Sequence, residues 1–271
     1  MATAVFFHAH PDDESIATGG VMSLAAAAGH RVVLVCATDG AVGEPVEGSV
    51  PHGSTLAEVR LAELEESGRI LGAARVEWLG YGDSGMVDES SNHHSDCFWQ
   101  ADVELAAQRL AGILVEEDAD LLTVYDSHGG YGHPDHIQVH RVGHRAAEIA
   151  GTPHVFESTM NRDRMRDLAD HAFEGADLDP DLARQRDEMR ETEMGTPAAG
   201  ITHQVDVAAA IDTKRRSMAA HRSQIGPDSF FLTMSDDAFL AAFGVECFIE
   251  REATRTGEPF GDDLFAALGD E

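Results

Sequence analysis

Short apolar runs alternate with amphipathic stretches along the first 160 residues of this chain. The β-branched and aromatic run TAVFF at residues 3–7 predicts a strand that ends at a histidine cluster. The continuous apolar run RVVLVCAT at residues 31–38 is typical of a parallel strand buried on both faces. Further strands are predicted at about residues 74–80, 120–125 and 153–159.

Helical patterns fill the spaces between these runs. An alanine-rich stretch at residues 15–30 closes at Gly29, and amphipathic patterns follow at about residues 55–71, 101–117 and 134–150. Because right-handed crossovers join parallel strands, this order predicts an α/β fold with a doubly wound, mainly parallel sheet and helices on both faces. Ligands of such sheets lie beyond the carboxyl ends of the strands.

The last 110 residues show a weaker pattern. Residues 161–200 are polar, acidic and poorly periodic, and we interpret them as a long excursion from the fold. A strand is then expected within residues 196–207, a helix at about 208–221 and a late strand at about 245–252. We expect one domain over residues 1–271.

Composition and charge narrow the class of protein. The chain is 43% hydrophobic, 25% charged and 6% aromatic, typical of a globular protein, and its formal net charge of -30 disfavours nucleic acid and anionic membranes as partners. No apolar run is long enough to span a bilayer, and three cysteines without a CxxC pair do not indicate a disulfide framework. We therefore expect a cytoplasmic protein with a small-molecule partner, and self-association into a homo-oligomer stays open.

Two segments have the composition of a metal site. HAHPDDES at residues 8–15 and GGYGHPDHIQVH at residues 129–140 each place histidine and aspartate where a helix begins. If they meet, His10, Asp13 and His136 supply two imidazoles and one carboxylate with room for water, a pattern of hydrolytic zinc sites. Read alone, the acids of the first segment are equally explained as ordinary first-turn residues of a helix. The recurrence of the pattern favours the metal.

Neighbouring residues supply candidates for proton transfer and charge stabilisation. Asp12, beside the expected ligand Asp13, is the candidate general base, although a capping or ligand-orienting acid is the alternative. A protonated His133 would stabilise the oxyanion or protonate the leaving group. Asp135 either pairs with His133 or orients a ligand histidine. Tyr131 either places its hydroxyl beside the reacting carbonyl or serves only as a packing residue.

At these motifs the chain resembles the zinc-dependent de-N-acetylase superfamily of the LmbE and PIG-L type, which is marked by AHPDDE and HPDH. The resemblance implies a Rossmann-like sheet, one Zn²⁺ (with Fe²⁺ or another divalent ion as an alternative) and hydrolysis of an N-acylated amino sugar. It makes His10, Asp13 and His136 the ligands, Asp12 the base and His133 the electrostatic or acid group.

Within that superfamily, RLAELEESGRILG and GYGDSGM are most similar to the mycothiol-pathway deacetylase and mycothiol-conjugate amidase branch. This similarity implies that Arg60 and Asp83 contact sugar or inositol hydroxyls. The residues themselves leave two alternatives open. Arg60 could form a surface ion pair on its helix, and Asp83 could serve simply to shape a turn. The terminal helix makes His221 or Gln224 a further candidate to reach the pocket.

The function expected from these observations is removal of an N-acyl group, most simply acetyl, from a glucosamine-containing small molecule by water that the metal activates. The runner-up is an amidase of larger mycothiol S-conjugates. An iron(II) oxygenase also uses two histidines and one carboxylate, but its ligands normally come from β-rich scaffolds. A non-catalytic sugar-binding protein would not need Asp12 or His133 beside an open site.

Overall fold

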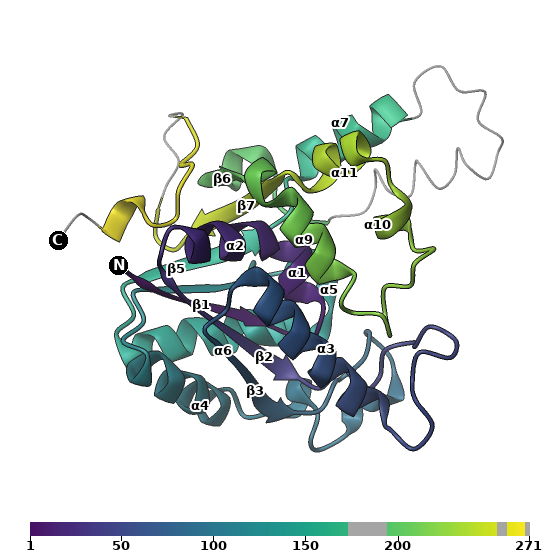
Figure 1. Ribbon diagram of the computed structural model, residues 1–271. Helices are drawn as coiled ribbons and strands as arrows, with labels where there is room; N and C mark the ends of the chain where they lie inside the picture. Colours follow the sequence, from purple (N-terminus) through teal and green to yellow (C-terminus); the bar gives the residue numbers. More distant parts are fainter. Residues whose placement is uncertain (173–193, 254–258, 269–271) are drawn as a thin grey trace.

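The computed structural model describes residues 1–172, 194–253 and 259–268, and within them a seven-stranded sheet runs in the order β3-β2-β1-β4-β5-β7-β6 (Figure 1). The strands are β1 (Thr3–His8), β2 (Arg31–Thr38), β3 (Arg75–Tyr81), β4 (Leu121–Tyr125), β5 (His154–Thr159), β6 (His203–Asp206) and β7 (Val245–Glu250). β3, β2, β1, β4 and β5 pair in parallel, whereas β7 runs antiparallel to both β5 and β6. The mainly parallel α/β sheet predicted from the sequence is confirmed.

Helices cover both faces of the sheet (Figure 1). α4 and α6 pack together on one face, and α2, α3 and α9 pack together on the other. The helices are α1 (Asp13–Ala17), α2 (Gly19–Ala27), α3 (Leu56–Leu71), α4 (Val103–Glu116), α5 (Gly129–Gly132), α6 (Pro134–Ala150), α7 (Arg162–Ala172), α9 (Ile211–Met218), α10 (Phe230–Thr233) and α11 (Asp236–Phe243). The 3₁₀ turns are η1 (Ser90–His93), η2 (Phe98–Gln100), η3 (Ala198–Gly200), η4 (Ala208–Ala210) and η5 (Ala266–Leu268).

The alternation of side chains along β1 divides the core between the two faces. Val5 and Phe7 join the cluster under α4 and α6, and Ala4 and Phe6 join the cluster under α2 and α3. All four are fully buried. Burial of a phenylalanine or valine side chain contributes about 1.5–3 kcal/mol, so a strand buried on both faces anchors the loop that follows it. That loop contains the first histidine motif.

The stretch predicted as one helix at residues 15–30 is two helices, α1 and α2, which meet at Thr18. The φ of Thr18 is -136°, outside the helical range, and its hydroxyl lies 2.8 Å from His8 Nε2. α2 also approaches η4 closely, because a Cβ at Gly20 would lie 2.4 Å from that of Val207. These are tertiary contacts, which the local pattern does not contain.

The later part of the chain departs further from the expected pattern. α7 and η3 lie inside the excursion predicted at residues 161–200, while residues 173–193 lie outside the described part of the structure. The helix predicted at 208–221 is η4 followed by α9, and α10 and α11 were not predicted. Among the described helices, none combines the length and the apolar character needed to cross a membrane. That the whole chain is one domain stays a prediction.

Candidate active site

The two histidine motifs meet at the carboxyl ends of the neighbouring strands β1 and β4. The chain leaves β1 towards β2 and leaves β4 towards β5 on the other side, so the sheet order reverses between them. Such a reversal opens a crevice above the strand ends, where ligands of doubly wound sheets bind. The turn after β1 presents His10 and Asp13, and α5 and the start of α6, after β4, present His133 and His136.

His10, Asp13 and His136 present potential ligand atoms to one another. Asp13 Oδ2 lies 3.2 Å from His10 Nδ1 and 3.3 Å from His136 Nε2. Atoms bound to one tetrahedral zinc at about 2.0–2.1 Å lie about 3.3 Å apart, so this spacing fits a shared ion. His136 Nε2 is buried and makes no hydrogen bond with the described residues. A bare imidazole nitrogen facing a carboxylate is what a divalent metal would satisfy.

His133 lies close enough to compete as a ligand, since His10, His133 and His136 each offer an atom within 4.8 Å of the others. The backbone amide of Asp135, however, donates to His133 Nδ1 at 3.1 Å. Burial and the nearby imidazoles of His10 and His136 lower the pKa of His133 to about 4, which keeps the ring neutral. A neutral ring that accepts at Nδ1 has its proton on Nε2, so it offers a donor and not a metal ligand.

The Asp135 carboxylate contacts His10 and not the ring of His133. Asp135 Oδ2 lies 3.2 Å from His10 Nε2, and the carboxylate also accepts hydrogen bonds from the backbone amide and the hydroxyl of Ser84. Asp135 is fully buried. Of the two roles considered from the sequence, this contact is that of an acid orienting a ligand histidine; pairing with the His133 ring is not observed.

Asp12 directly precedes the candidate ligand Asp13 and pairs with Arg60. Arg60 donates to Asp12 Oδ2 at 3.1 Å and also to the carbonyls of Pro11 and Gly40. Burial raises the pKa of Asp12 to about 6, against the opposing effect of Arg60. Arg60 is only 4% exposed, so the surface ion pair considered for it is wrong. Among the described residues its Nε has no partner.

Asp83 and Tyr131 border the same centre. Asp83 Oδ1 lies 3.5 Å from His10 Nε2, and its carboxylate accepts from the backbone amides of Gly85 and Val42. Asp83 is therefore more than a turn former. Tyr131 is 46% exposed, and its ring meets that of His136 edge-on at a centroid distance of 4.9 Å. It stands at the open side of the site.

Tyr125, the last residue of β4, is a site residue that sequence reasoning missed. Its ring stacks on His136 and its hydroxyl lies 2.9 Å from His8 Nδ1. The available signal was its position at the carboxyl end of a predicted strand directly before the second motif. His8 thus hydrogen-bonds inside the fold.

The loop between β4 and α6 requires glycine. Gly129 has φ 66°, and a Cβ there would lie 2.7 Å from that of His136. The loop can therefore cross directly over His136.

Three further histidines lie away from the centre. His221 does not line the pocket: it is fully buried, and its Nε2 contacts Glu14 Oε1 at 2.6 Å. His140 and His144, on the next turns of α6, form a separate cluster with Glu157, with 2.8 Å between His144 Nε2 and Glu157 Oε1.

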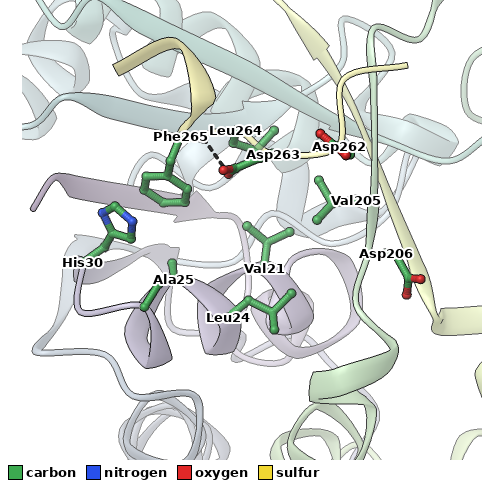
Figure 2. A pocket seen from close by; sticks show the side chains of 11 residues that line it. Val21, Leu24, Ala25, His30, Val205, Asp206, Asp262, Asp263, Leu264 and Phe265 are labelled. Carbon is green, nitrogen blue, oxygen red and sulfur yellow. Dashed lines mark hydrogen bonds between the residues drawn. The ribbon is translucent and has the colours of Figure 1, made fainter. Parts of the chain in front are cut away.

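A pocket of about 250 Å³ lies beside α2 and the C-terminal segment, remote from this chemistry (Figure 2). His30, which precedes β2, stacks on Phe265 there at a centroid distance of 4.1 Å. Val21, Leu24 and aspartates from the C-terminal segment line it. It is at the amino end of β2, whereas the histidine motifs are at the carboxyl ends of the strands.

Comparison with known proteins gives a family match and full-length relatives. Residues 5–147 match the family model PIG-L: GlcNAc-PI de-N-acetylase. A 1D-myo-inositol 2-acetamido-2-deoxy-alpha-D-glucopyranoside deacetylase of Thermobifida fusca is 35% identical over 96% of this chain and 97% of its own length. The protein with the same description from Thermomonospora curvata is 38% identical, covering 89% of this chain and 88% of that protein.

A solved structure supports the fold. The N,N'-diacetylchitobiose deacetylase of Pyrococcus horikoshii superimposes with a TM-score of 0.54 at 22% identity, covering 94% of this chain and 87% of that chain. At this identity the likeness shows the shared α/β architecture.

Proposed function

The chain belongs to the PIG-L family of GlcNAc-PI de-N-acetylases, and we propose that it hydrolyses the acetamide of 1D-myo-inositol 2-acetamido-2-deoxy-α-D-glucopyranoside, referred to below as GlcNAc-inositol. The substrate is that named for its full-length relatives. The single observation that supports the chemistry is the placement of Asp13 between the His10 and His136 nitrogens, with Asp12 alongside.

His10 Nδ1, Asp13 and His136 Nε2 are the groups that would hold a divalent ion, with zinc favoured by two nitrogens and one oxygen. When bound there, the ion polarises the acetamide carbonyl and lowers the pKa of a water molecule towards neutrality. The contact between Asp135 and His10 Nε2 fixes the orientation of that ring.

Asp12 is the proton carrier in the proposed reaction. Its carboxylate accepts a proton from the attacking water as the new C–O bond forms, and it returns that proton to the departing nitrogen as the C–N bond breaks. The products are acetate and a free amine. The raised pKa of Asp12, about 6, suits a group that must both accept and release a proton near neutrality.

His133 is proposed to stabilise the carbonyl oxygen as negative charge develops on it. With Nδ1 occupied by the Asp135 amide, its Nε2–H is the group available to donate. This replaces the protonated imidazole expected from the sequence by a neutral hydrogen-bond donor. Tyr131, at the open side, is assigned to donate from its hydroxyl to the same oxygen or to the sugar.

Asp83 is proposed to accept hydrogen bonds from hydroxyls of the sugar or inositol, for which a buried carboxylate at the edge of the site is suited. Arg60 is assigned to the same hydroxyls through the resemblance, and its guanidinium lies beside Asp12 through their ion pair. The cytoplasmic location and a homo-oligomeric state stay predictions.

The proposal is tested with the full chain loaded with zinc. GlcNAc-inositol is offered, and release of amine is measured with a fluorogenic reagent while acetate is measured by NMR. A bulky mycothiol S-conjugate is assayed in parallel for the amidase reaction. Equal amounts of amine and acetate from GlcNAc-inositol, with slower cleavage of the conjugate, are expected. Faster cleavage of the conjugate would favour the runner-up, and no release from either would overturn the proposal.

A further inference from the structure

The backbone of Asp12 has φ 127° and ψ -30°, a region that residues with a Cβ rarely adopt. A strained conformation of this kind persists only where surrounding contacts hold it, and it is found most often at functional sites. The Asp12 carbonyl accepts the backbone amide of Ser15 at 3.1 Å, so the same residue also begins α1. Whatever fixes this backbone also decides where the Asp12 carboxylate lies.

Glu14 contacts the Asp12 backbone from inside the protein. Its Oε2 accepts the Asp12 amide at 3.0 Å, and Glu14 is fully buried. Its other oxygen, Oε1, is held by the hydroxyls of Ser15 and Ser67 and by Nε2 of His221. Donors from α1, α3 and the turn after α9 therefore lock one carboxylate oxygen, and the second faces a single backbone N–H.

His221 is fixed in turn by its own neighbours. It is fully buried in the turn that follows α9, and the adjacent Ser223 donates from its amide and its hydroxyl to Glu63 of α3. The turn is thereby bound to the same helix that presents Ser67 and Arg60. The imidazole cannot move away from Glu14 without breaking these contacts.

We propose that Glu14 and His221 are positioning residues of the hydrolysis: acting through the Asp12 amide, they hold Asp12 in its strained conformation and aim its carboxylate at the attacking water. Arg60 complements them, because it binds Asp12 Oδ2 and the carbonyl of Pro11 from the other side. Backbone and side chain of Asp12 are then both fixed. This inference rests on the proposed function.

The alternative is that Glu14 and His221 only stabilise the core. Glu14→Met removes both acceptor oxygens at similar length, whereas Glu14→Gln retains one oxygen that can accept the Asp12 amide. Glu117→Met is the control, because the Glu117 side chain is only 7% exposed and pairs with Arg31 and Arg75 at the amino ends of β2 and β3, away from Asp12.

Steady-state kinetics distinguish a positioning role of Glu14 and His221 from a role in core stability alone. Glu14→Met is expected to lower kcat at least tenfold while KM and bound zinc stay within about twofold, and Glu14→Gln is expected to recover most of kcat. Glu117→Met should stay within about twofold of the wild type. In an Asp12→Ala background, Glu14→Met should cause no further loss, because it acts through Asp12. An equal loss in both backgrounds would overturn the proposal.

Crystal structures give a readout that does not depend on activity. In Glu14→Met, Asp12 is expected to relax to negative φ, whereas the wild type and Glu117→Met should keep φ positive. Persistence of positive φ in Glu14→Met would overturn the inference. This readout needs no turnover, so it still decides the inference if the wild type proves inactive on GlcNAc-inositol and only the proposed function fails. If Glu14→Met does not fold, His221→Phe serves in both assays, because it leaves Glu14 in place but removes the donor that orients it.

Discussion

The ring of Tyr125 lies flat against the imidazole of His136, with centroids 4.3 Å apart and an interplanar angle of 9°. The Tyr125 hydroxyl contacts His8 Nδ1 at 2.9 Å, and His8 Nε2 contacts the hydroxyl of Thr18 at 2.8 Å. This chain of contacts runs from Thr18, between α1 and α2, to the proposed ligand His136. The stacked ring holds the plane of the His136 imidazole.

Replacing Tyr125 by leucine should weaken metal binding. The stack contributes about 0.5–1.5 kcal/mol, and loss of a group that orients a ligand typically lowers metal affinity about tenfold or more. Competition with a zinc-binding dye measures this. Tyr125→Phe is the control, because it keeps the stack and loses only the hydroxyl. An unchanged affinity in Tyr125→Leu would mean that the ring does not orient His136.

Removing the metal should abolish hydrolysis and leave the fold in place. The proposed ligands lie in the turn after β1 and in the first turns of α1 and α6, above a sheet whose core is formed by other residues. Chelation is therefore expected to leave the far-UV circular dichroism unchanged and to reduce amine release to background. Added Zn²⁺ should restore activity. His136→Ala should bind no zinc at the site, whereas His140→Ala, one turn further along α6, should bind it normally. Chelation without loss of activity would exclude a metal-dependent reaction.

Asp12→Asn should retain zinc and lose activity. Asparagine keeps the shape of the side chain and tolerates positive φ but cannot accept the water proton, so kcat should fall about 10²–10⁴-fold. Zinc content by mass spectrometry and initial rates of amine release check the two parts separately. Loss of zinc together with activity would instead make Asp12 part of the binding site for the ion.

His133→Ala should lower kcat by about 10²–10³-fold with little change in zinc content, because it removes a donor to the developing oxyanion. His133→Gln supplies an amide N–H on a side chain of similar reach and should recover part of the rate. If His133 were a ligand instead, the alanine variant would lose zinc. Titration of zinc into the two variants therefore decides between the roles.

The strands and the motif residues were predictable because their signals are local. TAVFF and RVVLVCAT are short apolar runs, and the structure has β1 and β2 at these positions. The two prolines after His10 and His133 lie at the turns that bring these histidines together. Proximity of the motifs followed from the rule that parallel strands end at the same edge of a sheet.

The contacts that decide how the site is held were not predictable, because they join residues distant in sequence. Glu14 and His221 are 207 residues apart, and neither pattern nor spacing links them. The tautomer of His133 depends on one backbone amide, and the break at Thr18 depends on His8. The strained φ of Asp12 arises from those same tertiary contacts, whereas its neighbours in sequence suggested only an ordinary helix start.

Lys214, the sole lysine of the chain, places its ammonium 2.6 Å from Glu246 Oε1. Both residues are buried, and Glu246 also accepts the backbone amides of Gly20 and Val21 at the start of α2. Removing one partner of a buried ion pair leaves an uncompensated charge. Lys214→Met should therefore lower the free energy of unfolding by about 3–5 kcal/mol in urea denaturation.

Lys214→Met combined with Glu246→Gln should recover much of that loss, because glutamine has no charge and its oxygen can still accept an amide of α2. Arg145→Met is the control, since Arg145 pairs with Glu104 at the surface, where water screens the charges, and its unfolding midpoint should barely change. If the double variant is less stable than Lys214→Met, the hydrogen bonds that the α2 amides donate to the Glu246 carboxylate, more than its charge balance with Lys214, hold α2 against β7. The stability of α2 matters to the site, because Thr18 at its start contacts His8 and, through His8, the tyrosine that stacks on His136.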